Sequence, residues 1–289
     1  MVKGRQIMAK SKTFILMAML VLIFMFFGNL IGGEQGMMAA LWASLGVNFF
    51  SYFFSDKLVL SHYRATEVNQ KQFPELYQIV EHLADKAGLP MPKVYVIPDE
   101  VPNAFATGRN PKHAAVAATQ GLLKILSPEE LEGVLAHEMS HVRHYDILTG
   151  MIAAAFAGAI AYLANFFRFN NNNGKRNNGV LAAFLMPIAA SIIQMSISRE
   201  REYKADEGAA YLTGHPEWLA SSLSKLDDYA KNYHLRNATT QTSHMFIINP
   251  FSGIKGLSQL FSTHPSTADR IARLNEIALS IQRDEFITK

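Results

Sequence analysis

The sequence predicts a mainly α-helical integral membrane protein that carries a small β-sheet in a polar domain, and three observations predict this fold class. Four uncharged apolar segments reach the length of a membrane-spanning helix, at residues 13–32, 37–54, 147–167 and 180–197. Short strand-like runs, "KVYVI", "NAFAT" and "AAVAAT", lie between the second and third segments. Helical patterns fill most of the remaining chain. We therefore expect about four transmembrane helices and one polar domain assembled from two separate parts of the chain.

The first two apolar segments predict a membrane hairpin over residues 1–56. Only the short stretch "GEQG" separates them, and Glu34 is its single charged residue. A cleaved secretory signal fits less well, because the apolar run is too long and no small-residue cleavage site follows it. The second pair is expected to form another hairpin over residues 147–197, and buried core helices of a soluble domain are the alternative.

Basic residues predict the orientation of these spans. They flank the first hairpin on both sides, which places the N-terminus and the two polar parts, 57–146 and 198–289, in the cytoplasm. These residues are Lys3, Arg5, Lys10 and Lys12 before the first span, and Lys57, His62, Arg64 and Lys71 after the second. The loop "RFNNNNGKRNNG" between the third and fourth spans carries three basic residues that oppose this orientation.

The polar parts show individual elements. A helix is expected over 74–87, with proline in its first turn, apolar residues at helical spacing and glycine after its end. The run "SPEELEGVLAHEMSHVRH" predicts another helix, because Ser127 and Glu130 form a capping box around a proline at the first helical position. After the fourth span, "SREREYKADEGAAYL" predicts a charged helix, and amphipathic helices are expected near 216–233 and 267–282.

Composition narrows the classes of function. The chain has 289 residues and a net charge of +3, which is too weak an asymmetry to indicate a nucleic-acid partner. It contains no cysteine, so disulfides, thiolate catalysis and Cys-based zinc sites are excluded. Any metal ion must therefore be bound by histidine and carboxylate side chains.

The segment "HEMSH" predicts a metal site. On a helix His137 and His141 lie about 40° apart around the axis and one turn apart along it. Both imidazoles can therefore approach one zinc ion at about 2.0–2.1 Å. Glu138 points about 100° away from His137, beside the metal but outside its ligand shell. H-E-x-x-H is a zinc-protease pattern in which this glutamate is the base, so we expect Glu138 to be catalytic.

Other histidines are poor third ligands. His144 shares a face with His137, but the two are about 10.5 Å apart along a straight helix, too far for three imidazoles to surround one ion. His144 is therefore expected at an interface or beside the site. His113 and His244 have no supporting pattern, and we expect them to be structural or exposed.

A carboxylate from "SREREYKAD" fits the third position better, giving a His₂Glu ligand set. Glu202 and Asp206 are spaced i, i+4, so one can bind the metal while the other orients a ligand imidazole. Glu200 is a further candidate. Spacing alone favours this interpretation no more than a charged helix at the membrane surface, whose acids would pair with Arg199, Arg201 and Lys204.

The combination of "HEMSH", "SREREYKAD" and "THPSTADRIARL" resembles the HtpX family of membrane-bound zinc metalloproteases, relatives of the type I CAAX prenyl proteases. The likeness covers nearly the whole chain, including the N-terminal hairpin, "NAFATG" and the central apolar pair. It implies a zincin-like catalytic domain with one Zn²⁺ per chain, bound by His137, His141 and Glu202. It further implies that Glu138 is catalytic and that Asp206 supports the site.

The resemblance also implies an activity and a location. The expected function is cleavage of misfolded or damaged membrane proteins, in protein quality control and the stress response. The expected location is a bacterial inner membrane, with the active site facing the cytoplasm. Because both ligand helices must reach one ion, the chain between them must cross the bilayer an even number of times, as the central pair does.

Two further segments are candidates for roles in catalysis. His264 in "THPS" is a candidate donor to the oxyanion, with an ordinary loop histidine as the alternative. "NAFATG" is a candidate edge strand for an extended substrate, or simply one strand of a small sheet. Three other functions stay open: a prenyl-protein protease, a non-catalytic membrane metal carrier or adaptor, and a soluble hydrolase with buried hairpins. Against the carrier, none of the four spans contains an ionisable residue.

Overall fold

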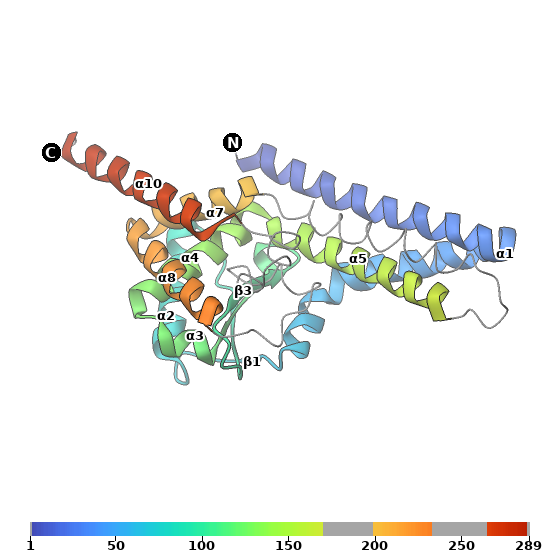
Figure 1. The fold of residues 1–289 in the computed structure, drawn as a ribbon, viewed down its shortest axis with the longest axis horizontal. Helices are drawn as coiled ribbons and strands as arrows, with labels where there is room; N and C mark the ends of the chain where they lie inside the picture. The colour runs from blue at the N-terminus through green and yellow to red at the C-terminus, as the bar shows by residue number, and fades with distance from the viewer. Residues whose placement is uncertain (1, 170–198, 233–264, 288–289) are drawn as a thin grey trace. The chain divides into compact units, whose positions relative to one another are not determined.

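The computed structural model describes residues 2–169, 199–232 and 265–287 (Figure 1). The predicted fourth span, 180–197, lies outside the described residues, as do His244 and His264. The chain divides into two compact units, which are described separately. One contains Met1–Ser55 and Leu148–Ser196, and the other contains Asp56–Ile147 and Ile197–Lys289. The prediction of a mainly helical protein with a small sheet is confirmed.

The first unit contains a helical hairpin. Helix α1 (Val2–His62) is interrupted at Gly32 and Gly33, and Gly33 adopts φ +58°, a conformation that side-chain-bearing residues rarely adopt. The chain turns back there, so that a Cβ atom on Gly28 would lie 2.4 Å from the carbonyl oxygen of Gly36. The two arms therefore contain the predicted segments 13–32 and 37–54.

Polar side chains link the helices of this unit. Asn48 donates a hydrogen bond to the Met17 carbonyl of the other arm at 3.1 Å. Helix α5 (Asp146–Phe169) contains the predicted third span, and the hydroxyls of Thr149 and Thr13 lie 3.2 Å apart. Within the described part of the chain, α1 alone is long and apolar enough to cross a membrane.

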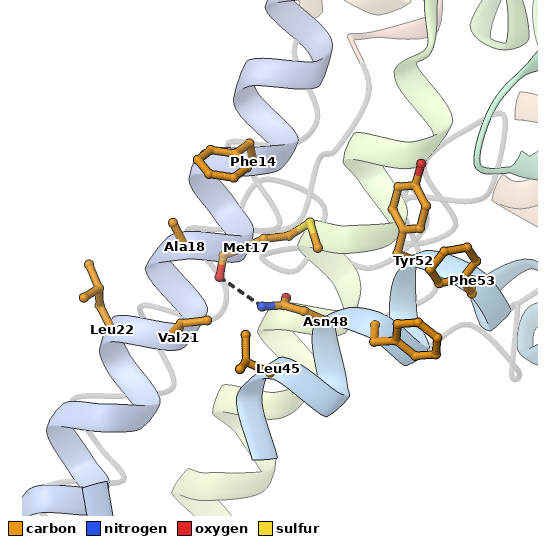
Figure 2. Close-up of a pocket in the computed structure, with 10 residues that line it drawn as sticks. Phe14, Met17, Ala18, Val21, Leu22, Leu45, Asn48, Tyr52 and Phe53 are labelled. Atoms are coloured by element: carbon orange, nitrogen blue, oxygen red, sulfur yellow. Dashed lines mark hydrogen bonds between the residues drawn. The ribbon is translucent and has the colours of Figure 1, made fainter. Parts of the chain in front are cut away.

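A wide apolar pocket of about 720 Å³ lies between the two arms (Figure 2). Phe14, Val21 and Leu22 line it from one arm, and Leu45 and Phe53 line it from the other. Phe14 and Leu22 are largely exposed to the surroundings. An arm surface of this composition suits a hydrocarbon environment better than water.

The second unit is built around a four-stranded mixed sheet with strand order β1-β2-β4-β3 (Figure 1). Strands β2 and β4 are parallel, and the two outer pairs are antiparallel. The strands are β1 (Thr66–Glu67), β2 (Lys93–Ile97), β3 (Ala104–Gly108) and β4 (Ala114–Thr119), with a short 3₁₀ helix (Pro111–His113) before β4. The three predicted strands are thus present, whereas β1 was not predicted.

In its described residues the second unit also contains six complete α-helices, two of which carry the candidate metal ligands. They are α2 (Pro74–Ala87), α3 (Gln120–Ile125), α4 (Pro128–His144), α7 (Arg199–Thr213), α8 (Pro216–Asn232) and α10 (Thr267–Ile287). The predicted capping box is confirmed, since Ser127 accepts from the Glu130 amide and Glu130 accepts from the Ser127 amide. Helix α4 therefore begins where the sequence predicts.

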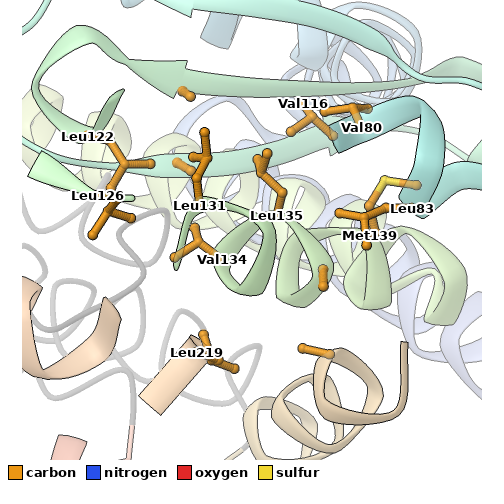
Figure 3. Packing of buried hydrophobic residues seen from close by; sticks show 14 of the residues in the cluster. Val80, Leu83, Val116, Leu122, Leu126, Leu131, Val134, Leu135, Met139 and Leu219 are labelled. Carbon is orange, nitrogen blue, oxygen red and sulfur yellow. The ribbon is translucent and has the colours of Figure 1, made fainter. Parts of the chain in front are cut away.

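Helix α4 lies at the centre of the hydrophobic core (Figure 3). Its buried side chains Leu131 and Leu135 lie on the side of the sheet, Met139 lies beside Leu83 of α2, and Val134 lies on the side of Leu219 in α8. The opposite sheet face packs against the end of α1 around Leu60. Strand β4 is consequently buried on both faces, which explains its uninterrupted run of small and apolar residues.

Candidate metal centre

Helix α4 places His137 and His141 on one buried face. Their Nε2 atoms lie 3.2 Å apart, with the two rings almost perpendicular. Two nitrogen ligands at about 2.0–2.1 Å from a tetrahedral zinc ion are roughly 3.3 Å apart. The two imidazoles therefore have the spacing of ligands to one ion, as the helical period predicts.

Helix α7 brings Glu202 to the same point. Its two carboxylate oxygens lie 3.7 Å from the Nε2 atoms of His137 and His141, one oxygen facing each ring. Ligand atoms of all three residues lie within 4.8 Å of one another. The close approach depends on Gly208, where a Cβ atom would lie 2.5 Å from the Ser140 hydroxyl of α4.

Glu138 lies beside this group and contacts the sheet. It is 7 % exposed, and its Oε2 accepts a hydrogen bond from the Ala106 amide of β3 at 2.9 Å. In the sheet formed by the described residues β3 is an edge strand, so this amide belongs to a backbone edge. The Glu138 carboxylate is thus held between the metal ligands and the edge of β3.

Asp206 contacts the His137 ring at the nitrogen that points away from the ligand group, and a buried arginine neutralises the charge of Asp206. His137 Nδ1 lies 2.9 Å from Asp206 Oδ1, while Arg270 of α10 donates to both carboxylate oxygens at 2.7 and 2.9 Å. Burial on its own would raise the pKa of Asp206, but the charge and hydrogen bonds of Arg270 lower it to about 2. The carboxylate therefore stays ionised and keeps the His137 Nε2 lone pair available for a metal.

His141 has a carboxylate partner of its own. Its Nδ1 lies 3.4 Å from Asp146 Oδ2, and Arg201 Nη1 lies 3.7 Å from Asp146 Oδ1. Burial on its own would lower the pKa of His141, but Asp146 and Glu202 raise it to about 9. Because a histidine binds a metal through a neutral ring, a metal ion competes with protonation of the Nε2 atom.

The remaining candidates lie elsewhere. His144 is half-buried and is not one of the three grouped ligands, while Glu200 is exposed and pairs with Lys204. His113 is exposed and bonds Asn110, as expected for a structural or solvent-exposed residue. His264 lies outside the described residues.

Sequence reasoning missed two residues. Asp146 lies five residues after a ligand histidine, at the boundary of two helices, and no spacing rule selects it. Arg270 comes from a helix far along the chain, in the segment "STADRIARL". A lone buried arginine opposite an acidic ligand helix has no signal in a single sequence.

Comparison with known proteins shows the family of this chain. The model of peptidase family M48 matches residues 70–278. A "Protease HtpX homolog" of Campylobacter hominis is 66 % identical over 282 residues, covering 95 % of this chain and all of that protein. Proteins of the same name from Campylobacter curvus and Sulfurovum are 61 % and 55 % identical, covering 94 % and 93 % of this chain and 98 % and 100 % of theirs.

A solved structure shares the fold. The crystal structure of S. mikatae Ste24p has a TM-score of 0.52 and 20 % identity, and the likeness covers 88 % of this chain. This chain spans 61 % of the length of Ste24p. The likeness at this identity concerns the fold alone.

Proposed function

The chain belongs to the HtpX proteases and to peptidase family M48, and from this premise we propose that it is a zinc-dependent membrane endopeptidase that cleaves misfolded or damaged membrane proteins. The relatives favour this function over a metal carrier or a soluble hydrolase. One observation carries the proposal: two imidazole nitrogens and the Glu202 carboxylate meet at one point, with a second buried glutamate beside them.

The donor set suits one zinc ion, and we propose His137, His141 and Glu202 as its ligands. Two imidazoles and a carboxylate leave one tetrahedral position for water or substrate, as in catalytic zinc sites. Zinc bound there would supply a Lewis acid that polarises the scissile carbonyl. The preference for zinc over another divalent ion rests on the ligand types and on the family.

Glu138 is the proposed general base and acid. Its carboxylate takes a proton from the attacking water, and it later donates that proton to the leaving amine. The Ala106 amide holds Oε2 of this carboxylate at 2.9 Å, and Oε1 is the oxygen that would face the water. Fixing the carboxylate in this way lowers the entropy cost of reaching the reactive geometry.

Strand β3 is the proposed platform for the substrate backbone. The Thr119 amide donates to the Asn103 carbonyl, and the Asn103 amide donates to the Thr119 hydroxyl. By the β3–β4 register, Ala104, Ala106 and Gly108 then direct their backbone groups away from β4, and among these groups the Ala106 amide is held by Glu138. An extended peptide can add to this edge as a further strand, with the scissile bond near Glu138. Recognition through the backbone suits a protease that accepts many unfolded sequences.

We propose four membrane spans, with residues 1–56 and 147–197 as two hairpins and residues 57–146 and 198–289 as one catalytic domain in the cytoplasm. The hairpin turn at Gly33 and the apolar surface of its arms support the first pair. The basic residues that flank this hairpin support the orientation. A bacterial inner membrane is the proposed location.

The test uses the full chain purified in detergent, with casein and an unfolded membrane protein as substrates. Glu138→Gln should keep stoichiometric zinc but lose at least about 10²-fold in cleavage rate. Glu202→Ala should lose bound zinc, and phenanthroline should abolish cleavage by the wild type. Glu200→Ala is the matched control, because Glu200 is exposed and paired with Lys204, and it should keep both properties.

Each measurement has an outcome that would contradict one part of the proposal. Cleavage retained by Glu138→Gln would refute the assigned base. Full zinc occupancy in Glu202→Ala would refute the third ligand. A farnesylated peptide cleaved in preference to the unfolded membrane protein would favour a prenyl-protein protease instead.

A further inference from the structure

The Nδ1 atom of each metal-site histidine contacts an aspartate, and each aspartate also contacts an arginine. For His137 these residues are Asp206 and Arg270, which are joined by two short hydrogen bonds and are almost fully buried. For His141 they are Asp146 and Arg201. The second set is looser, because its arginine–carboxylate distance is 3.7 Å and its side chains are 21 % and 14 % exposed.

The second set occupies a particular place in the chain. Asp146 is the first residue of α5, directly after Tyr145, which ends α4 in a left-handed conformation with φ 63°. Arg201 lies in the first turn of α7. These two residues therefore stand where the chain leaves the sheet-containing unit toward residues 147–197 and where it resumes in that unit.

The geometry also fixes the chemistry of His141. Its Nδ1 faces the Asp146 carboxylate at 3.4 Å, while its Nε2 lies 3.2 Å from His137 Nε2. A carboxylate that accepts the Nδ1 proton keeps the ring in the tautomer whose Nε2 lone pair points to the metal. Arg201 meets the other oxygen of this carboxylate, so it resists rotation of Asp146 away from the ring.

Resting on the proposed metal site, we propose that Asp146 and Arg201 form a clamp that positions His141 and joins the start of α5 to the start of α7. Arg201 acts on His141 through Asp146, whose carboxylate it meets. Metal affinity then depends on the start of α5 and the start of α7 staying in contact; these two points flank the apolar residues 147–197. Asp146 and Arg201 are positioning residues in this proposal.

The test measures zinc affinity of the full detergent-purified chain by competition with a chromogenic chelator. Asp146→Ala should weaken zinc binding about 10- to 100-fold, the usual cost of removing such a partner. Asp146→Asn keeps an acceptor oxygen and should lose less. Arg201→Met should weaken binding several-fold in the wild type and have no further effect in Asp146→Ala, because its effect passes through Asp146.

A second readout separates positioning from folding. The visible spectrum of the Co²⁺-substituted protein should change in intensity in Asp146→Ala, since the His141 ring is no longer held, at temperatures well below the unfolding midpoint. Lys204→Met on the same helix is the control, because Lys204 pairs with the exposed Glu200, and it should match the wild type in affinity and spectrum.

Two outcomes would overturn the clamp. Wild-type zinc affinity in Asp146→Ala, even with reduced thermal stability, shows that Asp146 does not position a ligand. Full additivity of Asp146→Ala and Arg201→Met shows that Arg201 acts independently. Failure of the wild-type chain to bind zinc at all would instead overturn the proposed function, so the two failures are distinguishable.

Discussion

Replacing Arg270 by Met tests whether the buried arginine is required to hold Asp206 and, through it, His137. Arg270 and Asp206 are 1 % and 2 % exposed, and two hydrogen bonds of 2.7 and 2.9 Å join them. Removing the arginine leaves an uncompensated carboxylate in the core, which costs about 3–5 kcal/mol. For a cooperative unit of 150–250 residues, this corresponds to a fall in Tm of roughly 6–20 °C.

The assay is thermal unfolding of detergent-purified, chelator-treated protein, so that metal binding does not contribute to stability. Adding Asp206→Asn to Arg270→Met should recover part of the loss, because asparagine removes the buried charge and keeps an acceptor for His137 Nδ1. Arg273→Met is the control on the same helix, where an exposed arginine lies over the Tyr203 ring, and it should cost at most about 1 kcal/mol. An unchanged Tm in Arg270→Met, or a double variant less stable than Arg270→Met, would refute the reasoning.

Two further predictions concern packing around α4. Glu130 accepts hydrogen bonds from Lys225 and Ser221, which outweigh its burial and lower its pKa, so Glu130→Gln should cost about 1–2 kcal/mol near neutral pH. Because the pKa of Glu130 is lower in the folded than in the unfolded protein, the loss of stability in Glu130→Gln should shrink as pH falls through the folded pKa. Urea unfolding across pH measures this loss. A loss equally large in acid would contradict a stabilising role of the ionised Glu130. Gly133→Ala would place a Cβ atom 2.7 Å from the Leu219 amide, so overpacking of about 1–3 kcal/mol should exceed the roughly 1 kcal/mol gain in helix propensity. At Gly150 a Cβ atom meets nothing within 4 Å, so Gly150→Ala should raise the Tm in the same assay. An equal rise in Tm for both variants would show that the close approach of α4 and α8 does not limit the size of residue 133.

Local features of the sequence were read correctly because their causes are local. The capping box sets the start of α4 within four residues, and the helical period then places His137 and His141 on one face. Glycines at the end of a long apolar run allow the turn that forms the first hairpin. None of these outcomes depends on the rest of the chain.

The third acid was open from spacing, since Glu200, Glu202 and Asp206 share one short helix. Packing of α7 on α4 through Gly208 buries Glu202 and Asp206 and leaves Glu200 in solvent. Only the resemblance to a family had pointed to Glu202.

The sequence by itself determined which residues are able to bind a metal and which helix carries two of them, because ligand chemistry and helical period are properties of a short segment. Tertiary structure alone decided which carboxylates face those imidazoles and which arginines neutralise them. Arg270 of α10 contacts Asp206 of α7, and Arg201 of α7 contacts Asp146 at the start of α5. Such pairs follow from the long-range packing of helices, and a buried charge is tolerated only where that packing delivers its partner.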